Sequence, residues 1–346
     1  MFLIRSARLR DLKAVLGLAK HLDSYNLPAD RKHLARLLEE SETSFRGAAE
    51  ENRRKFLFVA EDLRTRKIVG SSLIIARHGT PRLPHLSFEM GLETKKSVSL
   101  GKRISHTTLK LHADKAGFTE IGGLVVLPRY RRLGERVGKQ LSYARFAYMA
   151  GRPRAFRPRV LVEYLPRLDS QDGNELWKSL GQKFTRLSYH EADRLSVKTK
   201  EFILSLFPKE KIYACLLPDE AVRYLGTPGP GAEVSLRLLK PLGFRFLRQV
   251  DPFDGGPHYG ASFKKISAIE NTVFLNYKGT RSEEDLSSPP RLVMLERRFE
   301  VLAVVTPYRV EGHGFYLTAS AARALGVEQG ERLSATPFER RRDDGI

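Results

Sequence analysis

Hydrophobic positions in the first third of the chain predict strands and helices in alternation. Residues 2–6 form an apolar run typical of a strand, and the next apolar residues recur at helical spacing between residues 11 and 19. A second helix is predicted from Asp30, because turn-forming residues precede it. Two runs rich in Val, Ile and Phe, 55–63 and 67–76, then predict a hairpin.

A strand, a basic turn and a helix follow one another in the middle of the chain. Residues 122–127 are apolar, residues 128–134 carry arginines and a glycine, and a helical pattern then runs to Met149. The segment before them, 83–118, has mixed character. A helix that starts directly after a strand presents unpaired backbone N–H groups at its N-terminus, so this pattern predicts a phosphate-binding turn.

The second half of the chain continues the alternation of strands and helices, and after about residue 280 the predicted elements become short and follow a polar segment. A strand at 159–164, a helix near 175–180 and a Gly/Pro-rich loop at 226–231 precede a further short helix. Strands interleaved with helices predict an α/β (α+β) fold with a mixed twisted sheet. After a polar linker, short elements are predicted at 299–305, 314–317, 319–325 and 332–336.

The length of the chain and the change in its predicted elements together predict three regions. At 346 residues the chain exceeds one ordinary domain. We expect an N-terminal half at 1–150, a second half at 151–280 and a small β-rich C-terminal region at 281–346.

Composition narrows the class of protein. The formal net charge of +20 favours polyanionic partners, of which coenzyme A and nucleic acid are both examples. Cys215 is the sole cysteine, which excludes an intrachain disulfide framework, and the nine histidines show no ligand-like spacing, so no metal is expected. No apolar run spans a bilayer and no secretory leader is evident, so we expect a cytoplasmic protein without a membrane partner.

The basic turn carries the candidate chemistry. The residues from Arg131 to Gly138, Arg-Arg-Leu-Gly-Glu-Arg-Val-Gly, resemble the Arg/Gln-x-x-Gly-x-Gly/Ala turn with which GNAT acyltransferases hold the pyrophosphate of coenzyme A. One departure is clear, because the second small residue follows Gly134 by four positions instead of two. We therefore expect a longer or differently shaped phosphate loop.

A longer resemblance covers the chain to about residue 270. Several blocks in the same order are similar to the arginine N-succinyltransferase family. They include Leu-Pro-Ala at 27–29, Phe-Val-Ala-Glu-Asp at 58–62, Ser-Tyr-Ala-Arg-Phe at 142–146, Leu-Trp-Lys-Ser-Leu-Gly at 176–181 and Phe-Asp-Gly-Gly-Pro at 253–257.

The resemblance implies a fold of two GNAT-like halves and transfer of succinyl from succinyl-CoA to the α-amino group of L-arginine, a step of arginine catabolism. It also implies homo-oligomers and no permanently bound cofactor. The backbone of the fourth strand would polarise the thioester carbonyl, and the turn and its cations would hold the phosphates. The residues so implied are Leu124, Val125, Val126, Arg131, Arg132, Gly134, Gly138 and Lys139.

An arginine acceptor requires a carboxylate that faces its guanidinium group. The candidates are Glu163, Asp114, Asp169 and Asp254. The family pattern also departs beside Glu163, because Tyr164-Leu165-Pro166 lacks the Arg-Gly that usually follows this Glu and one apolar residue.

The family's proton-handling histidine is missing. The family carries Gly-x-x-His-Pro, and this chain has Gly-Thr-Pro-Gly-Pro at 226–230, so Gly229 stands in the histidine's place. Histidine titrates near neutral pH, which makes His258, His112 and His190 candidate substitutes. We select His258, with Glu163, as the catalytic pair.

Two other functions stay open. The chain could use another acyl-CoA and another amine, such as a polyamine. Alternatively it could be a non-catalytic basic protein that binds nucleic acid or an acidic partner. Tyr130 and Phe156 are the only aromatic residues in the basic segments 128–132 and 152–159, which gives little surface on which the bases of single-stranded nucleic acid could stack.

Overall fold

The computed structural model describes residues 1–22, 26–167, 175–286, 288–312 and 314–338. The chain divides into two compact units, each built from segments that are distant in sequence. Unit 1 comprises Met1–Arg77, Thr119–Pro158 and Ser262–Ile346, and unit 2 comprises His78–Phe118 and Arg159–Ala261. The three regions expected at 1–150, 151–280 and 281–346 stay a prediction.

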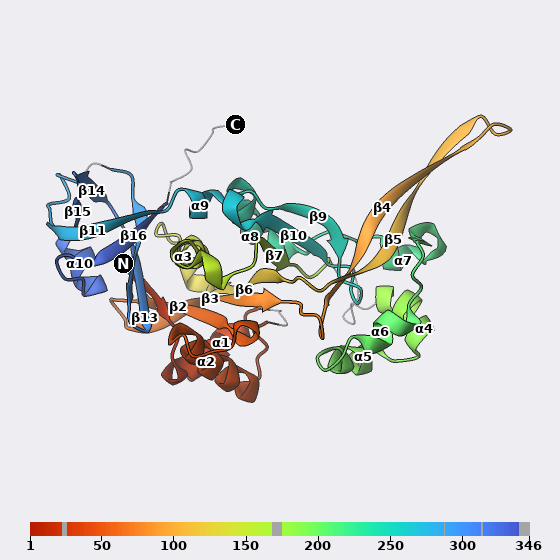
Figure 1. The fold of residues 1–346 in the computed structure, drawn as a ribbon, viewed down its shortest axis with the longest axis horizontal. Coiled ribbons are helices and arrows are strands. Elements are labelled where there is room, and N and C mark those ends of the chain that lie inside the picture. The colour runs from red at the N-terminus through yellow and green to blue at the C-terminus, as the bar shows by residue number, and fades with distance from the viewer. Residues whose placement is uncertain (23–25, 168–174, 287, 313, 339–346) are drawn as a thin grey trace. The chain divides into compact units, whose positions relative to one another are not determined.

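Unit 1 is built on a mixed sheet. Its strands run in the order β14–β15–β11–β16–β12–β13–β1–β2–β3–β6 (Figure 1). The pairing of β1 with β2 is antiparallel, as are those of β12 with β13 and β16, whereas β11 and β15 are parallel. The strands are β1 (Phe2–Ser6), β2 (Lys55–Asp62), β3 (Lys67–His78), β6 (Phe118–Val126), β11 (Val273–Thr280), β12 (Arg291–Arg297), β13 (Glu300–Thr306), β14 (Tyr308–Glu311), β15 (Gly314–Leu317) and β16 (Arg332–Pro337).

Helices cover this sheet on both faces, with α1 and α2 on one side of β2 and β3 and α3 on the other (Figure 1). Leu57 and Val59 of β2 pack in the core formed with α1 and α2, whereas the alternate residues Phe56 and Phe58 meet Tyr148 of α3. Burial on both faces explains why β2 is apolar continuously from Phe56 to Ala60 instead of alternating. The helices are α1 (Leu12–Ala19), α2 (Arg31–Phe45), α3 (Val137–Gly151), α9 (Ser267–Glu270) and α10 (Ala319–Leu325).

The C-terminal strands continue the same sheet. β13 pairs antiparallel with β1, with Ile4 opposite Ala303, and β12 and β16 follow in order. Helix α10 begins after Thr318, whose side chain accepts a hydrogen bond from the N–H of Ala321, and ends at Gly326 in the left-handed conformation. The β-rich C-terminal part predicted from the sequence therefore forms one end of the unit 1 sheet.

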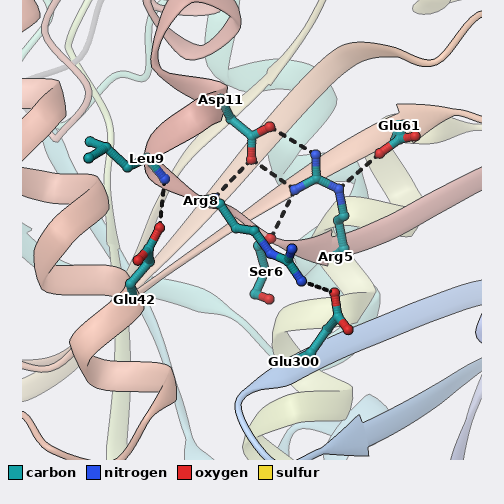
Figure 2. Close-up of polar contacts among 8 residues, drawn as sticks. All are labelled: Arg5, Ser6, Arg8, Leu9, Asp11, Glu42, Glu61 and Glu300. Carbon is teal, nitrogen blue, oxygen red and sulfur yellow. Dashed lines mark hydrogen bonds and ion pairs between the residues drawn. The ribbon is translucent and has the colours of Figure 1, made fainter.

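A buried ion cluster fixes the start of the chain in unit 1 (Figure 2). The guanidinium of Arg5 donates two hydrogen bonds of 2.8 Å to the carboxylate of Asp11 and one of 2.9 Å to Glu61. Arg8, three residues after Arg5, forms an ion pair with Glu300 of β13. These bonds hold β1, the start of α1 and β13 together.

The strands of unit 2 follow one another in the order β7–β10–β9–β4–β5–β8. The segment of mixed character at 83–118 is mainly a long hairpin of β4 and β5, with His85 opposite Asp114 at one end and Ser97 opposite Lys102 at the other (Figure 1). The strands are β4 (His85–Ser97), β5 (Lys102–Asp114), β7 (Arg159–Glu163), β8 (Ile212–Tyr213), β9 (Arg245–Val250) and β10 (Pro257–Ser262).

Helices α5 and α6 of unit 2 pack in one core with Trp177, which is fully buried and stacks on Phe253 with ring centres 4.6 Å apart. Trp177 begins a π-helix, Trp177–Gly181, where the sequence predicts an ordinary helix. The α-helices are α4 (Gln182–Thr185), α5 (Tyr189–Ser196), α6 (Glu201–Leu206), α7 (Asp219–Val222) and α8 (Glu233–Leu239). Among the described residues, no helix combines the length and apolarity needed to cross a bilayer. The expected α/β class with a mixed sheet is confirmed.

Candidate functional site

The end of β6 leads into the basic turn in unit 1. Gly123 lies inside the strand with a φ of +57°, a conformation that interrupts regular pairing and that side chains disfavour. Its carbonyl accepts a hydrogen bond from the hydroxyl of Ser71 at 3.2 Å. Leu124 after it is half-buried, and Val125 and Val126 are buried. Their expected role, polarising a carbonyl through backbone N–H groups, stays a prediction.

The turn after β6 is exposed and rich in arginine. Arg131, Arg132, Gly134 and Arg136 are all exposed. One N–H of the Arg131 guanidinium donates to the carbonyl of Val126 at 2.8 Å, which ties the turn to its strand. The remaining exposed cations give the turn a strong attraction for anions.

Helix α3 starts at Val137, three residues later than Gly134. Arg136 precedes it in the left-handed conformation, and its carbonyl accepts the N–H groups of Lys139 and Gln140. Among the described residues, no hydrogen bond uses the N–H of Val137 or Gly138. These two donors, at the positive end of the helix dipole, suit an anion.

The late helix start explains the unusual spacing of the motif. Gly138 falls in the first turn of α3, where a Cβ atom would lie 3.6 Å from Val126 in ordinary contact. Gly134 lies in the open loop, with nothing within 4 Å of a Cβ atom. Lys139, an expected phosphate ligand, instead places its ammonium 5.0 Å from the ring of Tyr143 and 4.7 Å from that of Phe338.

Three histidines surround Glu163, the last residue of β7 in unit 2. Its Oε1 atom lies 3.3 Å from His85 Nδ1 and 4.0 Å from the Nε2 atoms of both His78 and His258. His85 and His258 are buried, whereas the side chains of Glu163 and His78 are 29% and 35% exposed. The structure thus brings together His258 and Glu163, the two residues selected as the catalytic pair.

Burial shifts the pKa values around this cluster. It lowers the pKa of His85 well below the ordinary value, and the neighbouring histidines act in the same direction. Burial also lowers the pKa of Lys200, against the opposing charges of Asp251 and Glu163. His85 is therefore neutral at pH 7, and the ammonium of Lys200 is easier to deprotonate than an ordinary one.

The other predicted acceptor carboxylates have local partners. Asp254 Oδ1 accepts the N–H of Gly256 at 2.7 Å in a tight turn, and burial with the charge of Asp251 raises its pKa well above the ordinary value. Both carboxylate oxygens of Asp114 are engaged, one by Arg159 and the other by a backbone N–H. Asp169 lies outside the described residues. Of the three predicted carboxylates that the structure describes, Glu163 is therefore the one whose setting best suits a guanidinium group.

The backbone at Gly229 leaves no room for a side chain. Its N–H donates to the carbonyl of Leu165 at 3.0 Å, and a Cβ atom would lie 2.8 Å from the carbonyl oxygen of Pro166. Pro166 and Pro228 form an isolated antiparallel bridge at the same place. A histidine at position 229 would require this bridge to move.

The sequence analysis missed His78, His85, Lys200 and Asp251. They lie on separate segments of the chain, and the structure alone brings their side chains close to Glu163. One signal was available, because His78 and His85 border a short connection between two strands. The remaining candidates, His112 and His190, are half-exposed or exposed; His112 Nδ1 lies 3.4 Å from Glu89 Oε1.

Comparisons with known proteins agree with this architecture. The family model described as arginine N-succinyltransferase beta subunit matches residues 2–268. The chain is 31% identical to arginine N-succinyltransferase subunit beta of Pseudomonas aeruginosa over 97% of this chain and 98% of that protein. It is 29% identical to arginine N-succinyltransferase of Yersinia enterocolitica over 96% of each chain.

A solved structure shares the fold. The structure of arginine/ornithine succinyltransferase subunit AI from Pseudomonas aeruginosa superposes with a TM-score of 0.78 at 29% identity, covering 97% of this chain and 98% of that one.

Proposed function

Because this chain belongs to the arginine N-succinyltransferase beta subunit family, we propose that it transfers the succinyl group of succinyl-CoA to the α-amino group of L-arginine. The resemblance in sequence covers nearly the whole chain, including the basic turn and the segment that ends in Glu163. The chain would use coenzyme A thioester as a co-substrate, and no permanently bound cofactor is needed for this chemistry.

The observation that carries the proposal is the start of α3. Two backbone N–H groups, of Val137 and Gly138, are available there, and exposed arginines line the loop before them. Anions bind at such helix ends because the N–H groups point outward and the dipole adds positive potential. A pyrophosphate with two negative charges matches this arrangement.

The reaction needs little from the protein beyond position and charge. The neutral amine attacks the thioester carbonyl carbon, a C–N bond forms and the C–S bond breaks. The thiolate leaves and is protonated, while the amine nitrogen loses its proton to a base. Backbone N–H groups of Leu124–Val126 are proposed to stabilise the negative charge on the carbonyl oxygen.

In unit 2, Glu163 is proposed to pair with the cationic acceptor and His258 to receive the amine proton. A carboxylate binds a guanidinium group through two parallel hydrogen bonds, and Glu163 is partly exposed and therefore accessible. His258 Nε2 lies 4.0 Å from Glu163 Oε1, so one acceptor could contact both groups.

A different acceptor amine is the second candidate. Gly229 stands where the family has a histidine, and the backbone of Pro166 closes on that position. The loss of the Arg-Gly pair after Glu163 changes the same neighbourhood. Both changes concern the acceptor side, so the acyl donor would be kept while the amine differs.

A panel assay separates these functions. Purified chain is incubated with succinyl-CoA or acetyl-CoA and with arginine, ornithine, lysine or spermidine, and release of free thiol is followed. Turnover with succinyl-CoA and arginine supports the main proposal, and turnover only with another pair supports the second. Stabilisation by coenzyme A without any turnover would contradict both and indicate a binding protein.

The acceptor assignment is tested at His258. His258→Gln should lower kcat strongly and leave the affinity for coenzyme A unchanged, whereas His33→Gln, at an exposed position on α2, should change neither. Thermal unfolding of both variants controls for misfolding. Undiminished kcat in a folded His258→Gln variant would remove this residue from the mechanism.

A further inference from the structure

His78, His85 and Glu163 place their ligand atoms around one point in unit 2. One atom from each lies within 4.8 Å of the others. We propose that these three residues bind one divalent transition-metal ion of the zinc class, with an open coordination position. The site does not depend on the proposed acyl transfer, because metal binding is measured without turnover.

The distances agree with a tetrahedral site. Zinc bonds nitrogen and oxygen ligands at about 2.0–2.1 Å, which places ligand atoms of a tetrahedron about 3.3–3.4 Å apart. His85 Nδ1 already lies 3.3 Å from Glu163 Oε1. His78 Nε2 lies 4.0 Å from the same oxygen, so a rotation of its part-exposed ring would complete the geometry.

The electrostatics also favour a cation between these atoms. Imidazole nitrogens that converge on a carboxylate oxygen bring lone pairs together unless a proton or a metal ion lies between them. Neutral imidazole is the form of histidine that binds a metal ion.

The three residues lie at the ends of strands, which holds the site rigid while leaving an entry. His78 ends β3, His85 begins β4 and Glu163 ends β7. Exposure of Glu163 and His78 gives an ion access from solvent. Two histidines with one carboxylate suit zinc and its neighbours better than magnesium or calcium, which prefer oxygen ligands alone.

Asp251 and His258 also lie near this carboxylate, and their ligand atoms are within 4.8 Å of Glu163. They supply negative charge and a further imidazole next to the ion. Lys200 opposes binding through its positive charge, since it interacts with Asp251 and Glu163. A bound ion and a cationic acceptor would compete for Glu163.

The test uses the full chain without a histidine tag, stripped with a chelator and then dialysed against Zn²⁺ or Co²⁺. Metal content is measured by mass spectrometry, and Co²⁺ coordination by visible absorption. The variants are His85→Ala and the isosteric Glu163→Gln. The matched control is His112→Ala, since His112 also lies beside a glutamate, Glu89.

Wild type and His112→Ala should bind about one ion per chain, and Glu163→Gln should weaken binding by at least about 100-fold, since loss even of an outer partner costs about 10–100-fold. Glu163→Gln keeps the test valid if His85→Ala fails to fold. Equal metal binding by wild type and a folded Glu163→Gln variant would overturn the proposal, as would no binding by wild type.

Discussion

Replacing Gly134 by aspartate tests the phosphate-binding turn through charge alone. Nothing lies within 4 Å of a Cβ atom at this position, and the residue is exposed, so the substitution should leave the fold unchanged. The new carboxylate would lie in the arginine-rich loop immediately before α3. Gly134→Asn is the matched control, because it has the same shape without the charge.

The magnitude follows from Coulomb's law. A carboxylate at a distance of about 6 Å from each of two phosphate charges, in a water-exposed loop, costs about 0.7 kcal/mol per pair. Two pairs give about 1.4 kcal/mol, which corresponds to about tenfold weaker binding. Salt screens exposed charges, so the difference between the two variants should shrink as ionic strength rises.

The assay is calorimetric titration of coenzyme A into wild type, Gly134→Asn and Gly134→Asp at low and high salt. We expect Gly134→Asn to bind like wild type and Gly134→Asp to bind about tenfold more weakly at low salt. Equal affinity of the aspartate and asparagine variants at low salt would refute the placement of pyrophosphate at this turn.

Three further predictions concern stability and position 229. Arg5→Ala should lower the free energy of unfolding by about 3–5 kcal/mol, measured in urea, because it removes the cation that pairs with the buried carboxylate of Asp11, whereas Glu61 keeps its ion pair with Arg66. Exposed Arg36→Ala should change the free energy of unfolding by less than about 1 kcal/mol, and similar losses in the two variants would contradict this prediction. Burial opposes ionisation of Asp11, but hydrogen bonds from Arg5 outweigh it and lower the pKa of this carboxyl. The stability that this group contributes is therefore present above pH about 4 and is lost as the pH falls toward the lower folded pKa. Asp11→Asn should make the free energy of unfolding depend less on pH in this range. An unchanged pH dependence of the unfolding free energy in Asp11→Asn would contradict this prediction. Gly229→His should lower the melting temperature, because Cβ would lie 2.8 Å from Pro166 O, and should not raise acyl transfer; a stable, more active variant would show the opposite.

Local patterns predict elements whose signals are contained in a few residues. Asp30 marks the start of α2 because its side chain accepts the N–H of His33, and α10 runs over the expected residues. The β4–β5 hairpin was missed, since its outer half is largely exposed and polar and lacks a hydrophobic alternation. The pairing of β13 with β1 joins residues about 300 positions apart, and no local pattern encodes such a pairing.

The basic turn and the cluster around Glu163 also differ in how far the sequence alone can predict them. The proposed coenzyme-binding turn is contiguous in sequence, so a motif predicts it, although the helix begins at Val137 and not near Gly134. The cluster around Glu163 draws on distant strands, and His85 shows no sign in sequence of its burial beside a carboxylate. Glu163 and His258 were predicted from the sequence, whereas only the structure shows that His78 and His85 lie beside Glu163.

Amide hydrogen exchange at the start of α3 tests the central claim most directly. Exchange is measured for peptides that contain Val137 and Gly138, in free chain, with coenzyme A and with pantetheine, which lacks the pyrophosphate. We predict that coenzyme A slows exchange at these two amides and that pantetheine does not, because the phosphates accept their N–H groups. Slowing by both compounds alike, or saturating coenzyme A without any slowing at these amides, would contradict the account.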